Sequence, residues 1–219
     1  MGEPARAAPR RRARRIITVE ELYDAAVAVV DAEGLASLSM RRLSDATGIA
    51  PMTIYGFVAN KDELLAGLAG HVLQELPDPL GEDEGWRARI VHEMSGLRDA
   101  MVRHAGLVEL LTVGSDAAPV LDRLRERLLG ILRRSGAGDR VVVEGLGSLI
   151  ALTLGFAVGS RMRHVGVREE GYQRLSALPA EEFPNLTDLA DQYSEHWSDR
   201  SYARGLTAIL DAIDEAARD

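Results

Sequence analysis

The feature that most constrains this sequence is the stretch of residues 39–61, SMRRLSDATGIAPMTIYGFVANK. Its pattern predicts two short helices joined by a turn, because Ser39 can cap the first helix and Gly48 has the backbone freedom to end it. The side chains expected to face the core are Leu43, Ala46, Ile49 and Ile54. Pro51 suits the first turn of the second helix, where its missing N–H costs little. In a helix-turn-helix the second helix enters the DNA major groove, so residues 50–57 are the candidate reading element.

Helix-start signals on both sides of this stretch complete a small domain. Thr18 and Glu21 have the spacing of a capping box, and the apolar stripe that follows ends at Gly34. Asn60 and Glu63 repeat the arrangement before a second stripe of leucine and valine. We therefore predict a helix-turn-helix domain over residues 17–76, followed by an acidic, turn-rich linker over residues 77–85.

Charge is distributed unevenly along the chain. The net charge is −8, yet residues 1–15 carry six arginines against one glutamate, and residues 1–61 carry +2 overall. This polarity indicates an anionic partner at the N-terminal end. We expect residues 1–16 to be a disordered basic tail that contacts DNA; the alternative is a merely solubilising tail. Arg41 and Arg42 either face DNA phosphates or belong to a solvated helix face.

Composition excludes several kinds of chemistry. The chain has no cysteine, which removes disulfides, thiolate catalysis and cysteine-ligated metal. Its five histidines show neither i, i+4 spacing nor an HExxH motif, so the sequence indicates no metal, no cofactor and no enzyme activity. The basic start runs into charged residues instead of an apolar signal segment, which favours a cytoplasmic protein. The apolar run 145–159 is shorter than the ~20 residues that span a bilayer, so it predicts a buried helix and no membrane partner.

The remaining residues, 86–219, read as helices only, which makes the predicted fold all-α. Apolar periodicity predicts helices over residues 86–104, 107–112, 118–134, 139–164 and 199–217, with a modest helix over 185–197. Residues 165–184 lack a sustained helical period and are expected to form a polar loop. This larger C-terminal domain is the candidate for ligand binding and dimerisation.

Two sets of residues in this domain are candidates for those roles. Small residues recur every fourth position along the predicted helix 139–164 and favour a subunit interface, with close packing inside one chain as the alternative. The interface candidates are Gly147, Ala151, Gly155 and Gly159, together with Leu206 and Leu210 on the closing helix. Candidates for a cavity between helices are Met94, Met101, Thr153 and Phe156, each of which otherwise reads as plain core.

The N-terminal residues resemble the tetracycline-repressor (TetR) family of transcriptional regulators. The likeness covers residues 17–75 and is carried by AEGLASLSMRRL at 32–43, TGI at 47–49, TIY at 53–55 and FVANKDEL at 57–64. It implies an all-helical homodimer that binds a small molecule in its C-terminal domain. Position by position, it implies phosphate contacts by Thr53, Tyr55 and Lys61, and DNA-facing positions at Arg41, Pro51 and Met52. In the C-terminal half the likeness is looser, because Ala105 follows His104 where the family usually has proline.

The family often has a bulky or hydrogen-bonding residue where this chain has Gly56. The start of the reading helix therefore offers mainly apolar contacts, which favour thymine methyls over guanine edges as targets. The function that the sequence predicts is a ligand-responsive transcriptional regulator, a repressor released from a palindromic operator by a small molecule. The alternative is a sensor or assembly protein that no longer reads DNA.

Overall fold

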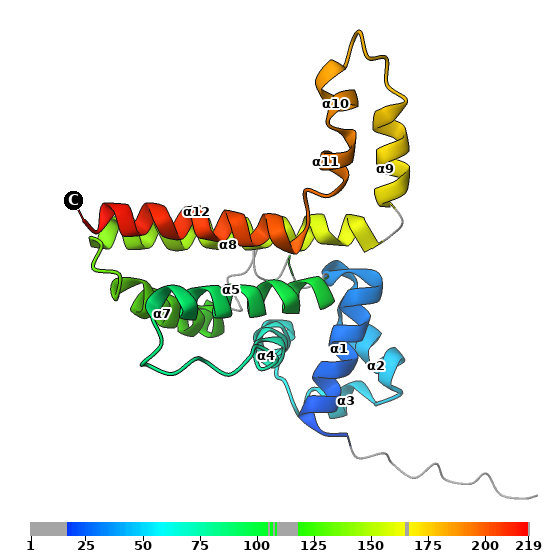
Figure 1. Ribbon diagram of the computed structural model, residues 1–219. Coiled ribbons are helices and arrows are strands. Elements are labelled where there is room, and N and C mark those ends of the chain that lie inside the picture. The colour runs from blue at the N-terminus through cyan, green and yellow to red at the C-terminus, as the bar shows by residue number, and fades with distance from the viewer. Residues whose placement is uncertain (1–16, 105, 107, 109–117, 165–166, 219) are drawn as a thin grey trace, which may run out of the picture.

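The computed structural model describes residues 17–104, 106, 108, 118–164 and 167–218, and these residues form helices and no strands. Figure 1 shows three parts. A small cluster, α1 to α4, lies against one end of a body built from α5, α7, α8 and α12, and a helical arm, α9 to α11, projects from the other side of the body. The predicted basic tail and most of the predicted helix 107–112 lie outside the described residues.

The N-terminal domain confirms the predicted helix order. It contains α1 (Val19–Glu33), a short 3₁₀ turn (Leu35–Ser37), α2 (Met40–Thr47), α3 (Pro51–Ile54) and α4 (Lys61–Leu73). Both halves of the capping box at Thr18 are formed, and Asn60 caps α4 through the backbone N–H of Glu63. The fully buried side chains that hold these helices together include Leu22, Leu38, Leu43, Ile54, Leu64 and Leu68. The prediction that Ala46 faces inward is wrong, because it lies on the solvent side of α2.

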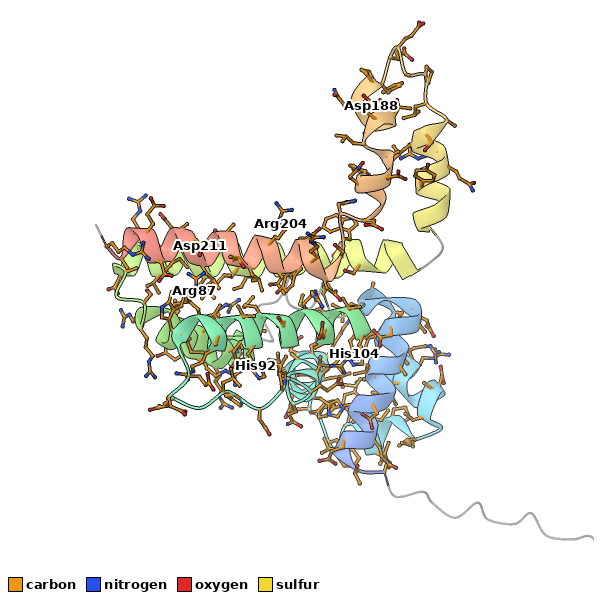
Figure 2. All side chains as sticks on the ribbon, in the orientation of Figure 1. Arg87, His92, His104, Asp188, Arg204 and Asp211 are labelled. Carbon is orange, nitrogen blue, oxygen red and sulfur yellow. The ribbon has the colours of Figure 1, made fainter. Side chains whose placement is uncertain are left out.

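The body consists of four helices around one apolar core. They are α5 (Trp86–Arg103), α7 (Ala118–Arg133), α8 (Asp139–His164) and α12 (Asp199–Ala216), and α8 packs along both α5 and α12. Ile90, Met94 and Leu97 place one face of α5 in this core. At the far end of the body, Arg87 pairs with Asp211 and Asp214 and so ties the start of α5 to the end of α12 (Figure 2).

The arm departs from the sequence prediction. Part of the predicted loop 165–184 is a helix, α9 (Val167–Ser176), and the single helix predicted over 185–197 is replaced by α10 (Pro184–Asp188) and α11 (Ala190–Ser194). The reason is packing: α9 lies against α11 and α10, and Leu175 and Ala190 are buried. A helix held by one or two such contacts has too few apolar residues to show a period.

Candidate DNA-binding surface and ligand domain

The turn between α2 and α3 is held by hydrogen bonds from residues on both sides. The side chain of Ser39 caps α2 by accepting from the N–H of Arg42 (3.1 Å). Gly48 ends α2 in the left-handed region (φ 71°), where side chains are disfavoured. The hydroxyl of Thr47 donates to the carbonyl of Leu43 (2.7 Å), and that of Ser44 donates to the carbonyl of Ile49. The direction in which α3 leaves the turn is therefore fixed locally.

Helix α3 is short and anchored from one side. Ile54 is fully buried and Val58, one turn later, is nearly so, while the chain between them continues as hydrogen-bonded turns. The opposite side carries the predicted DNA-contacting residues. Pro51 is exposed, Met52 is 81% exposed and Tyr55 is 48% exposed. The exposed side of α3 is therefore free to contact a partner, which agrees with the prediction for these residues.

Three further predicted residues lie on α3 or on the helices beside it. Thr53 is half-buried on α3 itself, Arg41 is exposed in the first turn of α2, and Lys61 is exposed as the first residue of α4. Lys61 lies at the positive end of the α4 dipole, which favours an anion such as phosphate, while Asp62 and Glu63 lie in the same turn. These placements agree with contacts to the phosphate backbone of DNA, and such contacts stay a prediction.

Arg42, in contrast, is engaged within the protein. Its Nε lies 3.0 Å from both carboxylate oxygens of Glu33 at the end of α1. The hydrogen bonds from Arg42 lower the pKa of the Glu33 carboxyl below its usual value. Arg42 thus fastens α2 to α1, which leaves Arg41 as the α2 arginine directed to solvent.

The predicted ligand residues gather around one side chain that we did not predict. The hydroxyl of Tyr202 on α12 donates to the carbonyl of Met94 (2.9 Å) and lies 2.9 Å from the hydroxyl of Thr153. The ring of Phe156 is 5.4 Å from the Tyr202 ring. Burial raises the pKa of Tyr202 to about 12, so the phenol stays neutral. A tyrosine on the apolar face of a helix needs a polar partner for its hydroxyl, which is the sequence signal that identifies this position.

Aromatic rings and a guanidinium group lie around Tyr202, and the same core also contains a buried ion pair. The Phe156 ring meets Trp197 edge-on at 5.1 Å, and the guanidinium of Arg98 lies 4.6 Å from the centre of the Tyr202 ring. Glu93, almost fully buried on α5, pairs with Arg127 on α7 at 2.7 Å. Met101 lies in the same core two turns further along α5. Met94, Met101, Thr153 and Phe156 therefore belong to one contiguous region of the domain.

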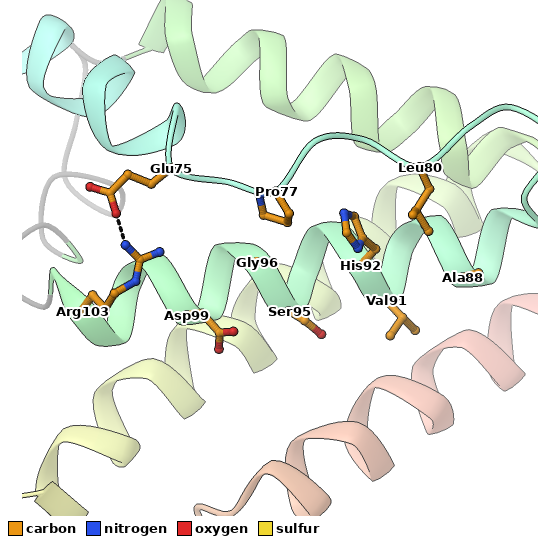
Figure 3. Close-up of a pocket in the computed structure, with 10 residues that line it drawn as sticks. All are labelled: Glu75, Pro77, Leu80, Ala88, Val91, His92, Ser95, Gly96, Asp99 and Arg103. Atoms are coloured by element: carbon orange, nitrogen blue, oxygen red, sulfur yellow. Dashed lines mark hydrogen bonds and ion pairs between the residues drawn. The ribbon is translucent and has the colours of Figure 1, made fainter.

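A separate groove lies on the outer face of α5. Its volume is about 650 Å³, and it runs between α5 and the chain segment that follows α4 (Figure 3). His92 lies beneath this segment and pairs with the carbonyl of Asp78 (2.9 Å), while Glu75 and Arg103 form an ion pair at one end. Since the side of α5 that bears Met94 faces the core, this groove is distinct from the predicted ligand region.

The glycine stripe on α8 divides into two faces. Gly147, Ala151 and Gly155 are exposed, and a side chain added at Gly147 or Gly155 would meet open space. Gly159 is different: a Cβ atom there would lie 2.2 Å from the Trp197 ring, so this glycine serves packing within the chain. The prediction that Gly159 belongs to a subunit interface is therefore wrong.

Leu206 and Leu210 also need correction. Both are buried in the core of their own chain, on the side of α12 that faces α8 and α5. The outer side of α12 carries small and polar residues instead: Arg200, Ala203, Arg204, Thr207, Ala208 and Asp211. Figure 2 shows Arg204 directed away from the body. An interface on α12 would use this outer side, because the two leucines are already covered.

The single chain leaves much of α8 uncovered. By length and composition alone, its residues 139–160 are apolar enough to cross a membrane, and 33% of their most apolar window is buried. The expectation that this run forms a helix buried within the chain is therefore only partly correct. Val143 and Val158 are exposed on α8 near Gly147 and Gly155.

Comparison with known proteins agrees with this arrangement. The family described as "Bacterial regulatory proteins, tetR family" matches residues 22–68, and "Tetracyclin repressor-like, C-terminal domain" matches residues 78–217. The repressor DrrR1 of Streptomyces coeruleorubidus is 31% identical over 175 residues, which cover 79% of this chain and 63% of that protein. The class E tetracycline repressor protein of Escherichia coli is 24% identical over 89% of this chain and 93% of its own length.

A solved structure extends the likeness to the whole fold. The TetR family protein ActR of Streptomyces coelicolor, in complex with actinorhodin, has a TM-score of 0.71 and 28% identity over 94% of this chain and all of its own. The helix-turn-helix and the helical body define a DNA-binding transcriptional regulator. The chain belongs to the TetR family.

Proposed function

We propose that this regulator is a repressor that binds a palindromic operator as a homodimer and is released by a small molecule bound in its C-terminal domain. The observation that carries the proposal is the surface of α3. Met52 and Tyr55 are directed to solvent, Ile54 anchors the helix from behind, and Arg41 and Lys61 add positive charge on neighbouring helices. Apolar side chains at the reading position favour thymine methyl groups, and the flanking charges favour phosphates.

Dimerisation is supported by the uncovered face of α8. The exposed face of small and apolar residues on α8 would allow the helix of a second copy to approach closely, and the outer side of α12 adds small residues among charged ones. Burying this face in a dimer would offset the ~1 kcal/mol that each mid-helix glycine costs. Two copies would place their α3 helices about one DNA turn, ~34–36 Å, apart.

The effector is proposed to bind in the region of Met94, Met101, Thr153 and Phe156, where all but Met101 contact Tyr202. The side chains are largely apolar and aromatic, with a few hydroxyl groups that could fix orientation. ActR, which was solved with actinorhodin, supports a small-molecule role for this domain. The lining favours an apolar effector with an aromatic ring system, within a protein that acts in the cytoplasm as a regulator and not as an enzyme.

Release would follow from a shift in population between two conformations. An effector that binds better to one separation of the α3 helices must weaken DNA binding by the same factor by which DNA weakens effector binding. The operator needs one separation, so any effector that stabilises another lowers operator affinity.

The test begins with the DNA that the purified protein retains from a library of genomic fragments at low and at higher salt. Sequence-specific retention, followed by gel-shift titration of the recovered site, is the expected result. A folded dimer that retains no specific fragment would contradict the proposal and favour a sensor that no longer reads DNA. Titration with aromatic compounds then tests release, and unchanged operator affinity with a compound shown by calorimetry to bind would remove the induction mechanism.

A further inference from the structure

His104 ends α5 at the point where the body meets the DNA-binding domain (Figure 2). Its two ring nitrogens face two carboxylates that belong to that domain. Nδ1 lies 3.0 Å from Asp31 Oδ2 in the last turn of α1, and Nε2 lies 3.0 Å from Glu75 Oε1, just after α4. The side chain is 17% exposed, so water competes only weakly for either contact.

This geometry requires a particular protonation state. A neutral imidazole carries one N–H and one lone pair, so it can donate to one carboxylate only. Its other nitrogen would then face a carboxylate oxygen at about 3 Å with two lone pairs opposed. The imidazolium donates from both nitrogens and satisfies both carboxylates. The arrangement of Asp31, His104 and Glu75 is therefore complete only when the histidine is charged.

When His104 is protonated, the charged groups around its ring have a net charge of zero. Asp31 faces the ring from α1, Glu75 from the segment after α4, and Arg103, the last residue of α5, also pairs with Glu75. Two carboxylates, one guanidinium and one imidazolium sum to zero. Loss of the histidine proton leaves a net negative charge at a partly buried junction, which favours separation of the two carboxylates from the ring.

A second contact at the same place limits how far the junction can adjust. A Cβ atom at Gly106 would lie 2.4 Å from the carbonyl oxygen of Val30, so only glycine allows the chain to pass this close to α1. The N–H of Gly106 also points to Asp31 at 3.4 Å. Among the described residues, Ala100 and Leu121 of the body pack into the apolar core of the DNA-binding domain, and such apolar contacts are not directional. The polar junction at His104 thus carries the directional restraint.

We propose that His104 is a positioning residue whose imidazolium holds the DNA-binding domain in one orientation on the body, so that this orientation depends on protonation of the histidine. The inference rests on the proposed function in one respect: domain orientation is the quantity that an effector would have to change.

The absence of native cysteine allows a direct test. Spin labels are placed at Ala46→Cys on α2 and Gly130→Cys on α7, both at exposed positions. Labelled protein is diluted with unlabelled protein, so that the distance measured lies within one chain whatever the oligomeric state. We expect a narrow distance distribution at mildly acidic pH, where the histidine carries its proton, and a broader or shifted one at alkaline pH, where it does not. No DNA or effector is required, so failure here is distinct from failure of the proposed function.

Variants separate protonation from simple loss of a side chain. His104→Gln should give the broad distribution at both pH values, whereas His104→Arg, a permanent cation with several donors, should keep a narrow one at both. If His104→Gln does not fold, Asp31→Asn is measured in its place. The Asn amide can hydrogen-bond to a neutral as well as to a charged histidine, so the pH dependence should vanish. His71→Gln is the matched control, because His71 pairs with Asp24 inside one domain (2.8 Å). A distribution independent of pH in the parent protein, or a pH dependence that survives His104→Gln, would overturn the proposal.

Discussion

The DNA-binding domain and the body differ in where their apolar surface lies. In the DNA-binding domain the large apolar side chains are buried, except on the face of α3. In the body, α8 exposes Val143, Val158 and a row of small residues while its other side fills the core. The first region is complete as a fold within one chain, whereas the second leaves an apolar face open, which we propose is covered by a second copy of the chain. Substitutions in the two regions should therefore affect different properties: folding and DNA binding in the first, and assembly in the second.

The largest effect is expected from Ile54→Ala in α3. Ile54 is fully buried, and removal of such a side chain costs ~2–5 kcal/mol of unfolding free energy through lost burial and the cavity left behind. DNA binding should be lost while the body stays folded. Chemical unfolding followed by circular dichroism, together with sedimentation, checks both statements. Leu149→Ala in the core of the body is the matched control, and one shared transition lowered equally by both substitutions would contradict separate stability of the two regions.

A charge on the exposed face of α8 should instead act on assembly. Gly155→Glu adds a side chain where a single chain has open space, so the monomer tolerates it, but a dimer would have to bury the carboxylate. We expect the dimer dissociation constant to rise by at least about a hundredfold, ~3 kcal/mol, in sedimentation equilibrium. Gly130→Glu on α7 has open space too and lies at an exposed position on another helix, so it should leave assembly unchanged. Equal effects of both substitutions would remove α8 from the interface.

A smaller effect is expected at the phosphate contacts. Lys61→Ala removes a charge at the positive end of α4 and should weaken binding to all DNA sequences by about tenfold, ~1.5 kcal/mol. The slope of log affinity against log salt should fall in magnitude by about one. Fluorescence anisotropy over a salt series measures both, with Arg123→Ala on the exposed side of α7 as the control. A loss confined to one base position would show that Lys61 reads sequence.

The smallest expected effect compares two helix caps. Ser39 accepts from the N–H of Arg42 at the start of α2, and Ser198 accepts from the N–H of Ser201 at the start of α12. Each Ser→Ala substitution should cost about 1 kcal/mol of unfolding free energy. Ser39→Ala should also weaken DNA binding, because α2 orients α3, whereas Ser198→Ala should not. Thermal unfolding measures the loss of stability in both variants. Gel shift then shows whether Ser39→Ala alone weakens DNA binding.

The helices that were predictable are those whose ends are set by neighbouring residues. Thr18, Ser39 and Asn60 each cap a helix through a backbone N–H three residues later, and Gly48 ends α2. Such signals are local, so they can be recognised in the sequence without knowing how the rest of the chain packs. The DNA-facing residues were predicted by resemblance on top of these signals. All of them except the half-buried Thr53 are exposed, and their contact with DNA stays a prediction.

The parts that were mispredicted depend on contacts between distant residues. Nothing near Gly159 indicates that Trp197, far along the chain, will lie on it, and α9 is a helix because α11 packs against it. The apolar face of α12 was recognised, but periodicity alone does not say whether Leu206 meets its own chain or another. Tyr202 was not predicted as a site residue, because its hydroxyl finds its partners on α5 and α8, far away in the sequence.

A dimer formed through the open face of α8, as proposed, would make the amount of protein a regulatory quantity. At low abundance the concentration of paired chains varies with the square of the concentration of free chains, so occupancy of an operator would rise more steeply than protein level. Promoter output would then respond to expression as a threshold and not in proportion. A face without side chains on one helix would in this way set how many molecules a cell must make before a gene is silenced.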